Sequence, residues 1–193
     1  MNPTEPNAPA VFHPRSIERF PELALLAAEL LRKPPALLGL SEAEARCVVG
    51  HMQLLDYPKG ATLLREYDAA ATGYMLLVLS GEVAVETAEP GHPGEAVPIS
   101  SLGAGSLLGE MSLLDGEPRS TECTAISAVQ AAGLSRQGLD QLMAQQPQVA
   151  AKLLAEVASI IANRLRALSD QLRLYAQLAS TLQREIDRLK RGA

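Results

Sequence analysis

The sequence predicts an α+β protein in which a barrel or sandwich of short antiparallel strands is flanked by helices and followed by one long C-terminal helix. Short β-rich runs separated by Gly, Pro and Asp fill residues 54–134. Helical spacing of apolar residues precedes that stretch, and an apolar heptad pattern follows it. With 193 residues, the chain is long enough for one well-buried domain plus an appendage. We therefore expect an N-terminal extension over residues 1–35, a β domain over 36–147 and a dimerisation helix over 148–193.

The N-terminal extension is expected to contain one short helix. Residues 1–15 are rich in Pro and Asn and are expected to be loose. Residues 21–32 carry apolar side chains at helical spacing, and Pro34 and Pro35 end the run. Such a helix normally covers the core of its own domain, although docking on a second subunit is the alternative. Ser41 and Glu44 then form a capping box that opens a helix ending near His51.

The β domain is expected to contain six short strands. Each run is β-rich and is bounded by turn residues, as in a barrel or sandwich. The runs are residues 61–65, 74–79, 82–87, 97–100, 122–126 and 128–134. Residues 90–94 (Pro-Gly-His-Pro-Gly) are expected to form a loop between strands.

Two helices are expected to end the chain. Ser135 caps the first, which runs to about Gln146, and Pro147 suits the first turn of the second. In the second helix, apolar residues alternate at spacings of four and three for about five heptads. They are Leu154, Ala158, Ile161, Leu165, Leu168, Leu172, Tyr175, Ala179, Leu182, Ile186 and Leu189. At 1.5 Å per residue this helix would be about 65 Å long, too long to lie on one small domain. It therefore predicts a parallel homodimeric coiled coil, with Arg184, Glu185, Arg188 and Lys190 as flanking charges.

Composition excludes several classes of function. A formal net charge of −5 argues against broad nucleic-acid binding. The two cysteines, Cys47 and Cys123, are too few and too far apart for a disulfide framework or a zinc site, and the three histidines show no metal spacing. No signal peptide and no apolar run of membrane length is evident, so the cytoplasm is the expected location. No nucleophile lies in a pattern with a base, so we expect no catalysis.

Residues 107–121 carry the chemistry of a site for a small phosphorylated ligand. Gly109 lets the backbone approach a ligand closely, and Glu110 is an acceptor suited to a sugar hydroxyl. Arg119 offers a planar fork to phosphate oxygens, and Ser120 adds a hydroxyl and a backbone N–H. We expect the apolar residues Met111, Leu113 and Leu114 to anchor a short helix between these groups, its first N–H groups pointing outward as an anion site. Phosphate and ribose recognition within one segment indicates a nucleotide.

Gly-Glu-Met-Ser-Leu-Leu at residues 109–114, followed by Pro-Arg-Ser at 118–120, resembles the phosphate-binding cassette of cyclic nucleotide-binding domains. The resemblance extends from about Leu37 to Leu178, and it includes Pro-Lys-Gly at 58–60 and the strand-turn-strand pattern of 77–85. Such domains occur in the bacterial catabolite activators (Crp/Fnr-like), in regulatory subunits of protein kinase A and in cyclic-nucleotide-gated channels. The resemblance implies that residues 36–147 form an antiparallel β-roll of the jelly-roll type.

The resemblance also implies roles for individual residues. Glu110 would take the ribose 2′-hydroxyl, Arg119 and Ser120 the cyclic phosphate, and Gly109 would supply a backbone contact. In the long helix, Ser169 would reach the ligand across the dimer, whereas Leu168 stands where the activators have a threonine that reads adenine. The candidate ligand-binding residues are Gly109, Glu110, Met111, Arg119, Ser120, Thr121, Leu168 and Ser169.

The sequence departs from the family pattern at several points. Thr121 stands where alanine is usual, and the turn Glu66-Tyr67-Asp68 lacks the usual glycine. Because tyrosine does not adopt a positive φ as cheaply as glycine, we expect this turn to be built differently. Catabolite activators follow the long helix with a winged helix-turn-helix, but here only Arg191-Gly192-Ala193 follow it, so we expect no direct DNA binding.

Three functions are consistent with these observations. The first is a dimeric cyclic-nucleotide sensor, with cAMP weakly favoured over cGMP, that signals through its C-terminal helix to a partner protein. The second is a dimeric scaffold whose pocket binds no nucleotide, as the departures at Thr121, Tyr67 and Leu168 suggest. The third is a subunit of a transcription regulator that acts through another DNA-binding partner.

Overall fold

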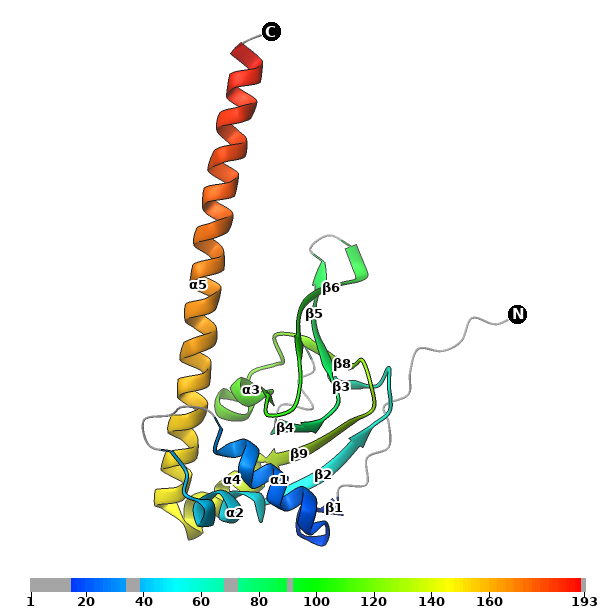
Figure 1. Cartoon of the computed structure of the whole chain (residues 1–193), viewed down its shortest axis with the longest axis vertical. Coiled ribbons are helices and arrows are strands. Elements are labelled where there is room, and N and C mark those ends of the chain that lie inside the picture. Colours follow the sequence, from blue (N-terminus) through cyan, green and yellow to red (C-terminus); the bar gives the residue numbers. More distant parts are fainter. Residues whose placement is uncertain (1–14, 34–38, 68–72, 90–91, 192–193) are drawn as a thin grey trace, which may run out of the picture. The chain divides into compact units, whose positions relative to one another are not determined.

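A computed structural model describes residues 15–33, 39–67, 73–89 and 92–191 (Figure 1). The chain divides into two compact units, Met1–Glu156 and Val157–Ala193, which are described separately. The expected loose segment before residue 15, the helix stop at Pro34 and Pro35, and the residues Asp68, Pro90 and Gly91 lie outside the described residues.

The first unit begins with short elements that cover one side of the β-structure. They are β1 (Arg15–Ser16), the 3-10 helix η1 (Ile17–Arg19), α1 (Pro21–Leu31) and α2 (Glu42–Val49). The helix α1 has the predicted bounds within one residue, and it buries Ala27, Leu30 and Leu31. It packs against α2 and against a strand of its own chain, which agrees with the expectation that it covers its own domain.

Two antiparallel sheets form the body of this unit. The larger sheet has the strand order β1-β2-β9-β4-β7, and the smaller has the order β3-β8-β5-β6. Bounds in the larger sheet are β2 (Met52–Tyr57), β4 (Tyr74–Ser80), β7 (Leu107–Leu108) and β9 (Val129–Ser135). Those in the smaller sheet are β3 (Thr62–Leu64), β5 (Val83–Glu89), β6 (His92–Leu102) and β8 (Glu122–Ala125). Every pair of neighbouring strands is antiparallel.

The core lies between the two sheets. Leu76 of β4 and Ala131 of β9 pack with Leu63 of β3, Val83 of β5 and Cys123 of β8 in one buried cluster. The central strand β4 is buried along five consecutive residues because helix α1 contacts it as well. A strand covered on both faces appears in the sequence as a continuous apolar run, which is why this strand was predicted with nearly correct bounds.

Three strands were not predicted, and a fourth begins earlier than predicted. Strands β1 and β7 have two residues each, too few for a pattern, and β2 contains an interior Asp and two adjacent leucines, which break the alternation of a half-buried strand. The strand β6 begins at His92, inside the segment expected to be a loop. Its hairpin with β5 has irregular register near Ala88 and Glu89, so pairing continues past the Pro and Gly residues that predicted a loop.

Two helices complete the chain. Helix α4 (Arg136–Gln145) is capped as predicted, with the Gly138 N–H donating to Ser135 Oγ at 3.1 Å. Helix α5 (Pro147–Arg191) follows without interruption for 45 residues, beginning at the predicted proline. Among the described residues, no helix combines the length and the hydropathy of a membrane-spanning segment. Antiparallel sheets, flanking helices and a long C-terminal helix confirm the predicted fold class.

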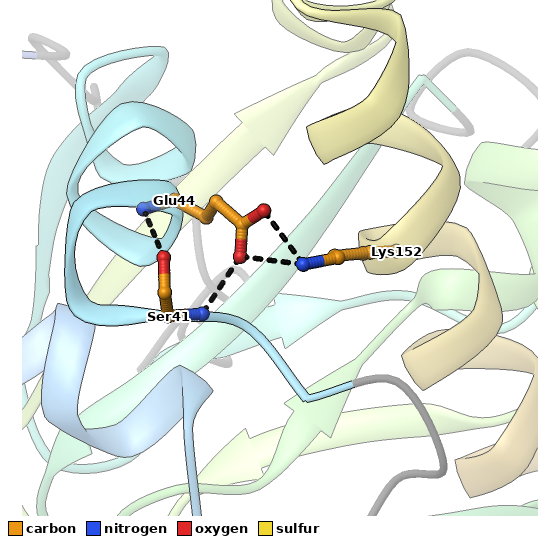
Figure 2. Close-up of polar contacts among 3 residues, drawn as sticks. All are labelled: Ser41, Glu44 and Lys152. Carbon is orange, nitrogen blue, oxygen red and sulfur yellow. Dashed lines mark hydrogen bonds and ion pairs between the residues drawn. The ribbon is translucent and has the colours of Figure 1, made fainter.

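An ion pair joins the start of α5 to the capping box of α2 (Figure 2). Glu44 N–H donates to Ser41 Oγ at 3.2 Å, and Ser41 N–H donates to Glu44 Oε2 at 2.8 Å. Lys152 Nζ donates to both carboxylate oxygens of Glu44, at 2.7 and 2.9 Å. The bond from Lys152 is the largest cause that lowers the pKa of Glu44 from 4.5 to about 2, and the bonds from Ser41 add to it. A local helix cap therefore also holds the first turns of α5.

One helical turn further along α5, Glu156 is in the opposite situation. Its side chain is 4% exposed, and neither carboxylate oxygen has a hydrogen-bond partner among the described residues. Burial raises the pKa of Glu156. A carboxylate in such a place lowers stability when it is charged. Glu156, the last residue of the first unit, therefore lowers the stability of the fold when its carboxylate is charged.

The ion pair at Glu44 predicts a specific pH dependence. Because the folded-state pKa is lowered, the stabilisation is complete above about pH 5 and is lost as the pH falls towards 2. We expect Glu44→Gln to lower the free energy of unfolding at pH 7 and to approach the wild type near pH 2–3. Urea unfolding followed by circular dichroism at several pH values measures this. Glu42→Gln, which removes a carboxylate from the same helical turn and its pair with Arg46, is the matched control. Equal losses in the two variants at pH 7 would contradict the assignment.

Candidate functional site

Residues 107–121 lead from the larger sheet through a short helix to the smaller sheet. After β7, Gly109 begins α3 (Glu110–Asp115), and Gly116 ends it; both glycines have positive φ. The chain then passes through Arg119 and enters β8 at Glu122. The two sheets therefore fix both ends of the segment.

Helix α3 does not use its apolar residues as predicted. Leu113 is buried, but Met111 and Leu114 are exposed. With six residues the helix has one inward face, and Glu110 and Leu113, three positions apart, occupy it. Met111 and Leu114 form the opposite pair, so the expectation that all three apolar residues anchor the helix was wrong. Leu113, together with the buried polar residues Glu110 and Ser112, holds α3 against the domain.

Arg119 is turned inward at the start of α3. Its side chain is 3% exposed, and Nη1 donates to the carbonyl oxygen of Gly109 at 2.6 Å. Nη2 donates to the carbonyl oxygen of Tyr74 at 2.6 Å, and the guanidinium carbon lies 4.9 Å from the centroid of the Tyr74 ring. Hydrogen bonds to a charged donor are among the stronger ones in proteins. They hold this buried cation against the backbone.

Glu110 lies at the same end of α3. It directly follows Gly109, the residue whose carbonyl accepts from Arg119, and its side chain is 2% exposed. The sequence placed a carboxylate and a guanidinium nine residues apart, and the fold brings both to the N-terminal end of one helix. A buried carboxyl group and a buried guanidinium here can serve a ligand that carries both hydroxyl donors and anionic oxygens.

Gly109 is required for the position of Arg119. Its φ of 73° lies in the left-handed region, and a Cβ atom built there would lie 2.2 Å from Arg119 Nη1 and 3.1 Å from Leu64 Cδ1. Any side chain would displace the guanidinium. The predicted close approach at this glycine is therefore to the protein's own arginine.

The turn at Tyr67 differs from the prediction. Tyr67 has a φ of 59°, although the sequence suggested that a tyrosine would avoid this region. Its backbone N–H donates to the carbonyl oxygen of Arg119 at 2.9 Å, and its side chain is 75% exposed. A left-handed non-glycine residue costs on the order of 1–2 kcal/mol. The bond to Arg119 offsets part of that cost, so the turn is fixed by its contact and not by its residue type.

Two tyrosines near Arg119 were missed by the sequence analysis. Tyr74, the first residue of β4, contacts the guanidinium, and its hydroxyl donates to the carbonyl oxygen of Leu63 at 3.3 Å. Tyr57 ends β2; burial raises its pKa, the Tyr74 phenol adds to this rise, and Arg119 opposes it. Neither residue belongs to the 107–121 segment. The only sequence signal is an aromatic residue at a strand end, which does not point to a site.

The remaining candidate residues are less enclosed. Ser120 is exposed and Thr121 is partly buried. Leu168 and Ser169 belong to the second unit, where both are exposed, and Ser169 Oγ donates to the Leu165 carbonyl oxygen of its own helix at 2.9 Å. Within the described part of the chain, no three His, Cys, Asp or Glu residues gather as metal ligands.

Comparison with known proteins gives one consistent family. Residues 54–146 match the model of the cyclic nucleotide-binding domain. A solved cyclic nucleotide-binding domain from Methylobacillus flagellatus is 33% identical, with a TM-score of 0.71 over 83% of this chain and 86% of that one. The catabolite activator protein of Thermus thermophilus is 30% identical, with a TM-score of 0.61 over 72% of this chain and 61% of that one.

Curated relatives are regulators. The CRP-like cAMP-activated global transcriptional regulator of Mycobacterium tuberculosis is 26% identical over 75% of this chain. The cyclic AMP receptor protein of Thermus thermophilus is 32% identical over 70% of this chain. The chain spans 61% and 59% of the lengths of these two relatives.

The geometry at Gly109 predicts unequal effects of alanine at the two ends of α3. Gly109→Ala should cost about 1 kcal/mol for handedness and about 2 kcal/mol more for the displaced, charge-assisted hydrogen bonds of Arg119. Gly116→Ala is the matched control, because Gly116 has a φ of +78° but has no atom within 4 Å of its added Cβ. Chemical denaturation measures both changes. Equal destabilisation by the two variants would show that the guanidinium does not occupy this place.

Proposed function

Because this chain belongs to the cyclic nucleotide-binding domain family, we propose that it is a regulatory protein that senses a cyclic mononucleotide. The observation that carries the proposal is that a guanidinium and a carboxyl side chain, Arg119 and Glu110, are both buried at the N-terminal end of α3. No catalytic step is part of the proposal.

The cyclic phosphate is assigned to Arg119. A planar guanidinium matches two phosphate oxygens at once, and burial strengthens the interaction because little water competes. Ser120 and Thr121 follow directly in the chain and bring hydroxyl and backbone N–H donors to the same loop. Gly109 and Met111, at the start of α3, are assigned backbone contacts with the ligand.

The ribose is assigned to Glu110. A carboxylate accepts hydrogen bonds from hydroxyl groups and repels phosphate, so its role differs from that of Arg119. Because Glu110 is buried, a hydrogen bond from a ligand hydroxyl to its carboxyl oxygens would replace hydrogen bonds that water cannot supply there.

We favour cAMP over cGMP as the ligand. Relatives that are named for cAMP cover about three quarters of this chain, which supports the preference. Ser169 is assigned a contact with the ligand of a second subunit. Leu168, in place of a base-reading threonine, weakens the case for strict selectivity.

The second unit is proposed to form a parallel homodimer. Seven large apolar residues of the heptad pattern between Leu165 and Leu189 are 44% to 68% exposed in the single chain. A stripe of this length is typical of coiled-coil seams. Ligand binding would shift the arrangement of the helices by its differential affinity, and a partner protein would read the change. A cytoplasmic location is part of the proposal, because the sequence has only two cysteines, Cys47 and Cys123, which lack the number and spacing of a disulfide framework.

A dimeric scaffold that binds no nucleotide is the second candidate. Arg119 already donates to two backbone carbonyl oxygens, so it has a structural role in the fold that does not require a ligand. A role as a subunit of a transcription regulator, acting through another DNA-binding chain, is compatible with either candidate.

The sensor proposal predicts binding that depends on Arg119. Calorimetry with cAMP, cGMP, AMP and inorganic phosphate should show a cyclic nucleotide as the tightest ligand, and Arg119→Ala should weaken it by about 3–5 kcal/mol, a hundredfold or more. Arg136→Ala is the matched control, because Arg136 lies at the other end of α3, with Nη2 3.4 Å from the carbonyl oxygen of Leu114. At 100 times the dissociation constant, ligand should add about 2.7 kcal/mol to stability. No stabilisation by any nucleotide would favour the scaffold.

The dimer proposal predicts that one charge in the seam separates the chains. Leu172→Asp should cost about 3–6 kcal/mol per dimer, since two leucines leave the interface, and so raise the dissociation constant roughly a hundredfold or more. Gln177→Asp, an exposed position outside the heptad seam, is the control. Sedimentation equilibrium measures both. A wild-type chain that sediments as a monomer at tens of micromolar would refute the dimer.

A further inference from the structure

We propose that Tyr74 is the positioning residue for Arg119, holding the guanidinium in place at the start of α3 before any ligand arrives. The inference rests on the proposed function, because it explains how the phosphate-binding group of that site is kept ready. Tyr74 itself needs no contact with the ligand.

Tyr74 holds the guanidinium from two directions. Its carbonyl oxygen accepts from Arg119 Nη2 at 2.6 Å, and its ring centroid lies 4.9 Å from the guanidinium carbon. That distance is within the range of cation–π attraction, which favours a cation near an aromatic face. One residue therefore fixes an edge of the guanidinium by a hydrogen bond and orients the group by its ring.

Tyr74 is itself held at both ends. Its backbone pairs with Ser135 of β9 in the larger sheet. Its hydroxyl donates to the carbonyl oxygen of Leu63, in β3 of the smaller sheet, at 3.3 Å. Tyr74 is therefore held to the larger sheet by its backbone and to the smaller sheet by its hydroxyl. Its ring gives Arg119 a rigid support.

The other contacts of Arg119 complete the arrangement. Gly109 accepts from Nη1 at 2.6 Å, and Tyr67 donates its backbone N–H to the Arg119 carbonyl oxygen at 2.9 Å. Both the main chain and the guanidinium are therefore fixed. An unrestrained arginine loses much rotamer entropy on binding an anion, and a pre-ordered one does not. The aromatic ring is the part of this arrangement that a substitution can remove, since the carbonyl groups belong to the backbone.

Binding measurements test the role of the ring. Tyr74→Leu keeps the backbone carbonyl and removes the ring, and it should weaken cyclic-nucleotide binding about 3- to 30-fold. Tyr74→Phe keeps the ring and removes the hydroxyl that donates to the Leu63 carbonyl oxygen, so it is the matched control and should stay within about threefold of the wild type. In an Arg119→Lys background, which lacks the planar group, the same Tyr74→Leu change should have an effect of about twofold or less. An equal loss in both backgrounds would overturn the proposal, because Tyr74 would then act elsewhere.

A ligand-free measurement separates this inference from the proposed function. Nitrogen-detected NMR of the guanidinium, assigned by the signals that disappear in Arg119→Lys, should show slowed rotation and solvent protection in the wild type and in Tyr74→Phe. The Tyr74→Leu variant should lose both the slowed rotation and the solvent protection of the guanidinium. If the wild type binds no nucleotide, the proposed function fails while this result still decides the positioning role. Unchanged guanidinium signals in Tyr74→Leu would overturn the positioning role of Tyr74. If Tyr74→Leu disturbs the backbone spectrum, fluorinated phenylalanines at position 74 are used in its place. Because fluorine weakens the attraction of the ring for a cation, the solvent protection of the guanidinium should fall as fluorination increases.

Discussion

The buried guanidinium of Arg119 connects parts of the chain that are far apart in sequence. Its bonds reach Tyr74 at the start of β4 and Gly109 at the end of β7, and its own carbonyl oxygen holds the turn at Tyr67. An arginine withdrawn from water is stable only when its donors are satisfied, so these contacts depend on one another. The site is therefore assembled by the sheets, and α3 alone could not form it.

Local patterns in the sequence predicted the parts of the fold that are determined locally. The capping box at Ser41 and Glu44, the proline that opens α5 and the apolar run of β4 depend on neighbours along the chain. Strand β2 pairs with the distant strand β9, and its own residues give no sign of that partner. The hairpin β5–β6 is local, but its irregular register extends the pairing past the Pro and Gly residues that indicated a loop. The bounds of these elements were therefore missed or wrong.

The candidate site shows the same division. A motif within 107–121 identified Glu110 and Arg119, because both lie in one continuous segment. Tyr74 is 45 residues from Arg119 and carries no motif, and only the folded sheets bring it to the guanidinium. The left-handed turn at Tyr67 was mispredicted because residue type suggested one conformation, while a long-range hydrogen bond stabilises another. The bond from Lys152 to Glu44, a residue of the α2 capping box, is another long-range contact that no local pattern indicates, since the two residues are 108 positions apart.

The missing Cβ of Gly109 makes two positions of this chain interdependent. A methyl group at 109 and a guanidinium packed against 109 cannot occupy the same space, so a residue larger than glycine at 109 requires the guanidinium to move. Since the two positions are ten residues apart, a glycine at the first and an arginine at the second can be recognised in a sequence without a structure. In other chains of this fold, a larger residue before the equivalent acid would signal an arginine facing another way.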